Sequence, residues 1–169
     1  MNDDIDLPSD GSCRPCIVVD SREQTPLAFR RLASVVGTLG TGDYSARGLE
    51  HHLVVERKSV ADLIGSLGPE RERFERELHR LRGFVFPRLL IVGTEAEVIA
   101  GRYRSNMKPR SVMASLHAFE ARYGVPIVWV ADPESAARLV ERWAAWCAYD
   151  VTRSARLLAK GMPEAVEAR

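Results

Sequence analysis

The sequence has few cysteines, no long apolar run and no excess of charge of either sign. Three cysteines among 169 residues are an odd number, so we expect reduced thiols rather than a disulfide framework. The apolar runs are short, as in Leu89–Val92, and no apolar signal follows a basic start, so we expect neither a transmembrane helix nor a secretory signal. No Gly-x-x-x-x-Gly-Lys-Ser/Thr loop occurs, which argues against an activity driven by nucleotide hydrolysis.

The net charge of +1 hides an uneven distribution along the chain. Residues 1–10 contain four aspartates and no base, whereas residues 101–110 contain only basic charges. These bases are Arg102, Arg104, Lys108 and Arg110. The pattern predicts that any nucleic-acid contact is confined to one patch. We also expect a disordered acidic tail over 1–14, one domain over 15–160 and a loose tail over 161–169.

Hydrophobic periodicity predicts a mixed sheet flanked by helices, which is an α/β domain. The predicted strands are 16–20, a bent stretch from 35 to 44, 53–57, 88–92 and 126–130. The predicted helices begin at Pro26, Val60, Pro69, Pro109 and Pro133, with a last helical stretch over 150–160. The bent stretch and strand 53–57 are expected to form a hairpin.

Acidic side chains end or adjoin several of these strands. Asp20 ends the first strand, and Asp43 lies on the strand next to Glu56. Because alternate residues of a strand share a face, Glu56 and Lys58 should point the same way. Clustered carboxylates without His or Cys favour a hard cation, Mg²⁺ or Mn²⁺, which could polarise a phosphodiester. Alone, however, Glu-x-Lys is a common surface pattern.

Three segments together resemble a known family. Residues 19–23 (Val-Asp-Ser-Arg-Glu), 42–44 (Gly-Asp-Tyr) and 55–63 (Val-Glu-Arg-Lys-Ser-Val-Ala-Asp-Leu) are similar to the nuclease domain of the XPF family. The resemblance extends over about residues 16–148. It implies a restriction-endonuclease-like PD-(D/E)XK fold and a role in DNA repair. The implied activity is Mg²⁺-dependent cutting of DNA near a junction of duplex and single strand, such as a flap or fork.

The resemblance also implies a catalytic set: Asp20, Glu23, Asp43, Glu56, Arg57, Lys58 and Asp62. Within it, Asp43 and Glu56 are the implied metal ligands, with Asp20 as a further acid of the same metal site. The implied metal is Mg²⁺ or Mn²⁺.

The other implied roles concern water and phosphate. Glu23 would assist through water, and Lys58 would act on the attacking water. Arg57 and Arg22 would position or neutralise phosphate, so Arg22 joins the basic segment as an expected DNA contact. Asp62 would support the site from the next helix by holding Arg57 or Lys58.

The sequence departs from the family in one site-proximal position, and its partners stay open. Glu77 falls where many members have glutamine. DNA affinity is expected to come from the nuclease face, from a dimer or from a separate partner. Family members pair through their nuclease domains, and the late helices carry a large apolar surface. Its residues are Leu139, Val140, Trp143, Trp146 and Tyr149. We therefore expect a homodimer or heterodimer through these helices.

Several alternatives remain. Cys13-x-x-Cys16 could suggest zinc, but no paired ligands accompany it, and His51-His52 is expected to be solvent-exposed in the hairpin turn. A related restriction or junction-resolving nuclease, or a DNA-binding or scaffold subunit without activity, would also fit part of the pattern. Composition suits a cytoplasmic bacterial or phage protein that would associate with the nucleoid when bound to DNA.

Overall fold

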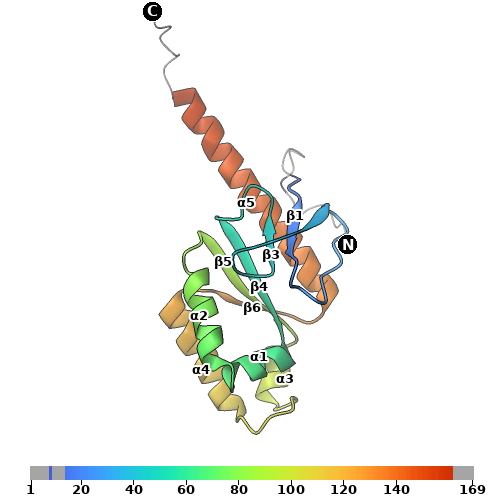
Figure 1. Ribbon diagram of the computed structural model, residues 1–169, viewed down its shortest axis with the longest axis vertical. Helices are drawn as coiled ribbons and strands as arrows, with labels where there is room; N and C mark the ends of the chain where they lie inside the picture. Colours follow the sequence, from blue (N-terminus) through green and yellow to red (C-terminus); the bar gives the residue numbers. More distant parts are fainter. Residues whose placement is uncertain (1–7, 9–13, 162–169) are drawn as a thin grey trace, which may run out of the picture.

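The described residues, 8 and 14–161, form a mixed sheet with helices on both faces (Figure 1). In this computed structural model the strands are β1 (Ile17–Asp20), β2 (Ser34–Gly37), β3 (Tyr44–Ala46), β4 (Leu53–Ser59), β5 (Phe86–Val92) and β6 (Ile127–Val130). The helices are α1 (Val60–Leu67), α2 (Arg71–Leu81), α3 (Glu95–Ile99), α4 (Pro109–Tyr123) and α5 (Pro133–Gly161). The predicted α/β class is confirmed. The predicted tails over 1–14 and 161–169 lie almost wholly outside the described residues.

The sheet has the order β2-β1-β3-β4-β5-β6. β3 pairs with β1 and β4 antiparallel, whereas the other three neighbouring pairs are parallel. The β3–β4 hairpin is therefore confirmed. The stretch predicted as one bent strand is two strands, β2 and β3, which lie on opposite sides of β1.

Gly42 fixes the turn that precedes β3. Its φ of 77° is in the left-handed region, and a Cβ at this position would collide with the Val54 side chain on β4. The close approach lets the Asp43 amide donate to the Val55 carbonyl at 2.8 Å. A glycine at 42 thus brings Asp43 against β4.

One predicted helix, beginning at Pro26, is wrong: residues 26–32 form irregular backbone with bends instead. The buried carboxylate of Glu141 on α5 explains the difference, because a single oxygen of it accepts hydrogen bonds from three backbone amides. The donors are Arg30, Arg31 and Leu32, at 2.9, 2.7 and 3.0 Å. In a helix starting at Pro26 some of these amides would bond to carbonyls one turn back, so a long-range partner overrides the local pattern.

We expect Glu141→Leu to lower the free energy of unfolding by about 2–4 kcal/mol, because three amides lose their acceptor. Glu141→Gln keeps an oxygen in place and should lose less. Urea unfolding followed by circular dichroism measures both variants. A loss below about 0.5 kcal/mol for the leucine variant, the range of ordinary surface substitutions, would contradict this account of the loop.

The remaining helices follow their local signals. Ser59 caps α1 and Gly68 follows its last residue, as predicted. Gly124, with a φ of 64°, ends α4. The two helices predicted after Asp132 are one continuous α5, whose far end extends beyond the rest of the domain (Figure 1). α3 was not predicted, although Thr94 and Glu97 form its capping box.

One apolar core lies on each face of the sheet. On β4, Leu53 and Val55 pack with α5, whereas Val54 packs with α1, α2 and α4. The same alternation continues toward the end of the strand, so Glu56 and Lys58 face α2 and Arg57 faces the α5 side. Within the described residues, none of the helices combines the length and apolar character needed to cross a bilayer.

Candidate functional site

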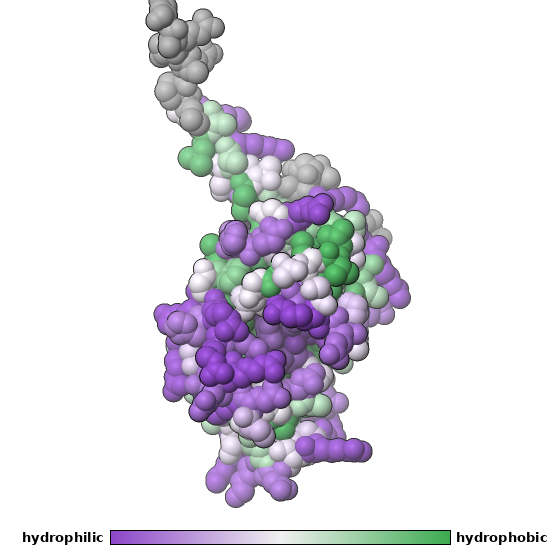
Figure 2. Space-filling model, viewed as in Figure 1, coloured by the Kyte–Doolittle hydropathy of each residue, from purple (hydrophilic) through white to green (hydrophobic). Residues whose placement is uncertain are grey.

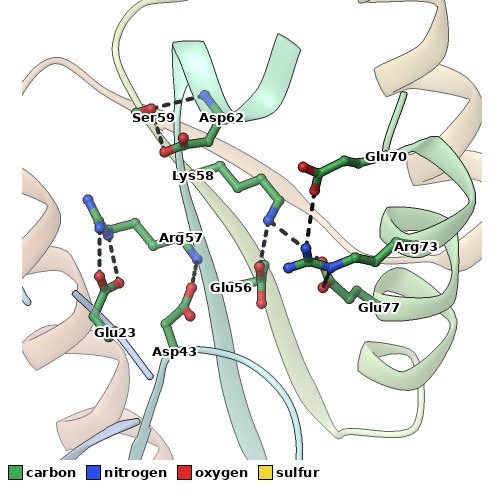
Figure 3. Close-up of polar contacts among 10 residues, drawn as sticks. All are labelled: Glu23, Asp43, Glu56, Arg57, Lys58, Ser59, Asp62, Glu70, Arg73 and Glu77. Atoms are coloured by element: carbon green, nitrogen blue, oxygen red, sulfur yellow. Dashed lines mark hydrogen bonds and ion pairs between the residues drawn. The ribbon is translucent and has the colours of Figure 1, made fainter. Parts of the chain in front are cut away.

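The end of β4 carries a carboxylate and an amine side by side (Figure 3). Glu56 is buried, and its Oε1 accepts a hydrogen bond of 2.7 Å from Lys58 Nζ. Lys58 Nζ also lies 3.6 Å from Glu77 Oε2 and 5.0 Å from the centre of the Phe74 ring. Burial lowers the pKa of Lys58, but the charges of Glu56 and Glu77 raise it further, so the amine is held protonated.

Asp43 places a second carboxylate next to Glu56. The Arg57 amide donates to Asp43 Oδ2 at 2.7 Å, which fixes the carboxylate against β4 (Figure 3). Burial, followed by the charge of Glu56, raises the pKa of Asp43 to about 7. Burial also raises the pKa of Glu56, although Lys58 opposes it. The fold therefore holds two acids together at an electrostatic cost that a cation would relieve.

Asp20 ends β1 with its carboxylate buried. Four N–H groups donate to it: the amide, Nε and Nη2 of Arg22 at 2.9, 2.6 and 3.2 Å, and the Leu39 amide at 2.7 Å. Burial raises the pKa of Asp20, but these hydrogen bonds and the Arg22 charge outweigh it and lower the pKa. In this structure Asp20 holds Arg22, and its metal-binding role stays a prediction.

Glu23 and Arg57 form an ion pair on the opposite side of β4 from Lys58 (Figure 3). Arg57 donates from Nη2 to Glu23 Oε1 at 3.0 Å and from Nε to Oε2 at 3.2 Å. It also donates to Thr25 Oγ1 at 2.9 Å, and the Tyr44 hydroxyl donates to Glu23 Oε2 at 3.3 Å. The structure thus pairs two residues that were predicted to act separately on water and phosphate.

Asp62 lies at the start of α1 and bonds to the helix cap. Its Oδ2 accepts the Ser59 hydroxyl at 2.6 Å, and Ser59 Oγ accepts the Asp62 amide at 3.1 Å. Within the described part of the chain, its hydrogen bonds go to Ser59 rather than to Arg57 or Lys58. Asp62 supports the junction between β4 and α1.

α2 contributes charged residues that sequence reasoning did not assign to the site. Arg73 bonds to Glu77 Oε1 through Nε at 3.3 Å and to Glu70 Oε2 through Nη1 at 3.2 Å (Figure 3). The i,i+3 and i,i+4 spacings in the sequence could have indicated this network. Glu77, whose role was open, lies against Lys58.

Two adjoining cavities open on these residues, of about 510 Å³ and about 200 Å³. Asp43, Glu56, Arg22 and Arg73 line both of them. Figure 2 shows a hollow edged by hydrophilic residues near the centre of this face. The larger cavity also contacts Glu23, Arg57, Lys58 and Asp62, and the smaller one Asp20, so the seven predicted catalytic residues gather around one depression.

The predicted DNA contacts divide into two groups. Arg22 lines both cavities, and its side chain is 67% exposed. Arg102, Arg104, Lys108 and Arg110 are exposed around the start of α4, but they line neither cavity. Of the two paired-residue patterns set aside, Cys13 lies outside the described residues. In the hairpin turn His51 is exposed as expected, whereas His52 is half-buried.

Within residues 8 and 14–161, no three His, Cys, Asp or Glu side chains gather closely enough to form a metal-binding cluster. The donors that remain, Asp43 and Glu56, are nonetheless suited to Mg²⁺. Their ligands are all oxygen, and Mg²⁺ is commonly bound through one or two carboxylates with water and phosphate oxygens. Burial and, second, the charge of Glu56 raise the pKa of Asp43, and a bound cation would offset both effects.

The fold is that of XPF nucleases. XPF from Aeropyrum pernix has a TM-score of 0.62 at 23% identity, over 92% of this chain and 67% of that chain. XPF from Aeropyrum pernix in complex with DNA has a TM-score of 0.63 at 25% identity, over 82% of this chain and 66% of that chain. This chain spans about two thirds of the length of each.

The sequence itself carries the family assignment. The model of the ERCC4 domain matches residues 19–142, so the chain belongs to the ERCC4 domain family. The predicted XPF-type nuclease domain is thereby confirmed, and the family is one of structure-specific DNA nucleases. Comparison with curated proteins gives no match.

Proposed function

We propose that this protein is a Mg²⁺- or Mn²⁺-dependent endonuclease that hydrolyses a phosphodiester near a junction of duplex and single-stranded DNA. The observation that carries the proposal is the pair of Asp43 and Glu56, beside protonated Lys58, in a cavity at the end of β4. Family membership supplies the nuclease class. The likeness to XPF from Aeropyrum pernix in complex with DNA supports the choice of DNA.

Asp43 and Glu56 would hold the metal ion. When bound, this ion polarises the phosphodiester and lowers the pKa of a water molecule. Lys58 is fixed by Glu56, so its ammonium orients the attacking water or stabilises charge on the phosphate. Glu56 is buried and Asp43 is half-buried, so little water competes for these groups and their electrostatic interactions are strengthened.

Arginines around the cavities would hold the DNA backbone. Arg22 and Arg73 are exposed enough to reach phosphate, although each already bonds to an acid of the site. The basic segment over 102–110 would supply further phosphate contacts at a distance from the cut. Each phosphate contact makes binding more sensitive to salt.

Cleavage of end-labelled DNA tests the proposal. The panel contains a 3′-flap, a fork, a four-way junction and a plain duplex, each with Mg²⁺, with Mn²⁺ and with EDTA. We expect cutting of the flap or fork near the branch, no cutting in EDTA, and loss of cutting in Asp43→Ala and Glu56→Ala. Preferred cutting of the four-way junction or of duplex would indicate another nuclease class. Binding of branched DNA without cutting would indicate a subunit that lacks activity.

Glu77→Gln should strengthen DNA binding by about two- to threefold at low salt, because it removes one negative charge beside Lys58. The amide keeps the size of the side chain and can still accept from Arg73. Fluorescence anisotropy over a salt series measures the effect, with Glu120→Gln on the exposed face of α4 as control. A gain that persists undiminished at high salt would contradict an electrostatic origin.

Self-association is proposed through the far end of α5. Of the predicted surface, Val140 belongs to the core, and Leu139 and Trp143 pack against it. Trp146 is 44% exposed, and Leu157 and Leu158 are 60% and 71% exposed. Sedimentation of the protein and of a Trp146→Glu variant tests this surface, since a dimer formed through it should dissociate in the variant.

A further inference from the structure

A third cavity lies on the α5 side of the end of β4. Its volume is about 560 Å³, within the range of small-molecule sites, and its wall is mostly apolar. Pro26, Ala28 and Pro133 contribute to this wall. Thr25 and Arg57 line both this cavity and the 510 Å³ cavity that contains Asp43 and Glu56, so the two cavities are neighbours.

Arg57 forms a rigid boundary between the cavities. The alternation of β4 turns its side chain away from Glu56 and Lys58, and only 14% of it is exposed. Three hydrogen bonds to Glu23 and Thr25 fix the plane of the guanidinium. Because its charge is already paired, Arg57 offers a flat face on which a base can stack rather than a free charge for phosphate.

Arg30 supplies an available cation to this third cavity. Its side chain is 76% exposed, and its ion pair with Glu134 is 3.4 Å long between two exposed groups. Such pairs are weak and exchange readily. The cavity therefore combines an apolar wall, a planar guanidinium and an exchangeable cation.

We propose that this cavity binds one unpaired deoxynucleotide of the substrate, with its base against Arg57 and the proline rings and its phosphate near Arg30. The proposal rests on the proposed function, because the neighbouring 510 Å³ cavity, which contains Asp43 and Glu56, would hold the phosphate that is cut. A base that is paired and stacked in a duplex cannot enter such a cavity. The cavity would thus explain recognition of the single-stranded arm at the junction.

Ala28→Glu tests this subsite, because Ala28 is an exposed residue of the cavity wall. Gln at the same position keeps the size of Glu without its charge, and Ala121→Glu adds the same charge on exposed α4, which lines none of these cavities. Anisotropy in EDTA measures binding of a labelled oligothymidine and of a blunt duplex of equal length. We expect Ala28→Glu to weaken oligothymidine binding about tenfold and to leave duplex binding close to that of Ala121→Glu.

An abasic scan of the fork adds a second measurement. In the wild-type protein, one abasic position in the unpaired arm next to the junction should weaken binding, and in Ala28→Glu that position should lose its effect. Equal loss for oligothymidine and duplex, or a wild-type scan without a sensitive position, would overturn the subsite. Selective loss without any DNA cutting would leave the subsite standing and contradict the proposed function. DNA cutting without selective loss of oligothymidine binding would overturn the subsite and leave the proposed function standing.

Discussion

Asp43→Asn should abolish DNA cleavage, by at least about a thousandfold, while making the metal-free protein more stable at neutral pH. Asn keeps the oxygen that accepts the Arg57 amide, so the hairpin contact at 2.7 Å can persist. It cannot carry the negative charge that would hold a cation. Loss of activity combined with a gain in stability distinguishes a functional acid from one that the fold requires.

The pH dependence follows from the raised pKa of Asp43, about 7 in the folded protein against 3.8 as its ordinary value. Between these values the native state binds the proton more tightly, so wild-type stability falls as the pH rises from about 4 to 7. Above that range the cost of the buried charge is complete. Asp43→Asn removes the contribution of Asp43 to this dependence, while that of Glu56 remains, and should gain about 2–4 kcal/mol at pH 8 and little at pH 4.

Urea unfolding in EDTA across this pH range measures the difference between the two proteins. Asp150→Asn, on the exposed surface of α5, is the matched control and should change stability by less than about 0.5 kcal/mol. If Asp43→Asn were less stable than wild type at pH 8, the account of Asp43 as a buried acid held against Glu56 would be wrong.

Lys58→Met should have the second large effect, on both activity and stability. The lysine side chain is 11% exposed and lies between Glu56 and Glu77. Its folded pKa lies above the ordinary value of 10.5, so its stabilising contribution is present at neutral pH and is lost only at alkaline pH. Methionine fills the same volume but leaves buried Glu56 without the cation that bonds to it, whereas Glu77 keeps its bond to Arg73. We expect a loss of about 2–4 kcal/mol at pH 7 and about a thousandfold lower cleavage.

A double variant separates the two consequences of Lys58→Met. Adding Glu56→Gln removes the uncompensated charge, so stability should recover while cleavage stays absent. Lys160→Met at the exposed end of α5 is the control for loss of a lysine. Failure of Glu56→Gln to restore stability would show that Lys58 stabilises the fold through packing on Phe74 instead of through Glu56.

Much of the site was predictable because its signals are local. Glu56 and Lys58 share a face through strand alternation, and the Ser59 cap and Gly68 bracket α1. These relations depend only on the spacing of residues along the chain, which can be read from the sequence.

Long-range partners could not be predicted in the same way. Glu141 captures amides more than a hundred residues away, and no local pattern at residues 26–32 indicates this. Arg57 and Glu23 were both identified, but their pairing depends on how the β1–β2 connection folds over β4. Strand alternation alone predicts that Arg57 points away from Lys58. It does not predict that Glu23 is the partner of Arg57 on that side.

The central claim is that Asp43 and Glu56 hold a divalent metal ion with which this protein cuts branched DNA. Single-turnover cleavage of an end-labelled fork tests it most directly, with wild type, Asp43→Asn and Asp150→Asn assayed side by side in Mg²⁺ and in EDTA. The account predicts cutting near the branch by wild type and Asp150→Asn in Mg²⁺ alone, and none by Asp43→Asn. Equal cutting by Asp43→Asn, or cutting by wild type that persists in EDTA, would contradict it.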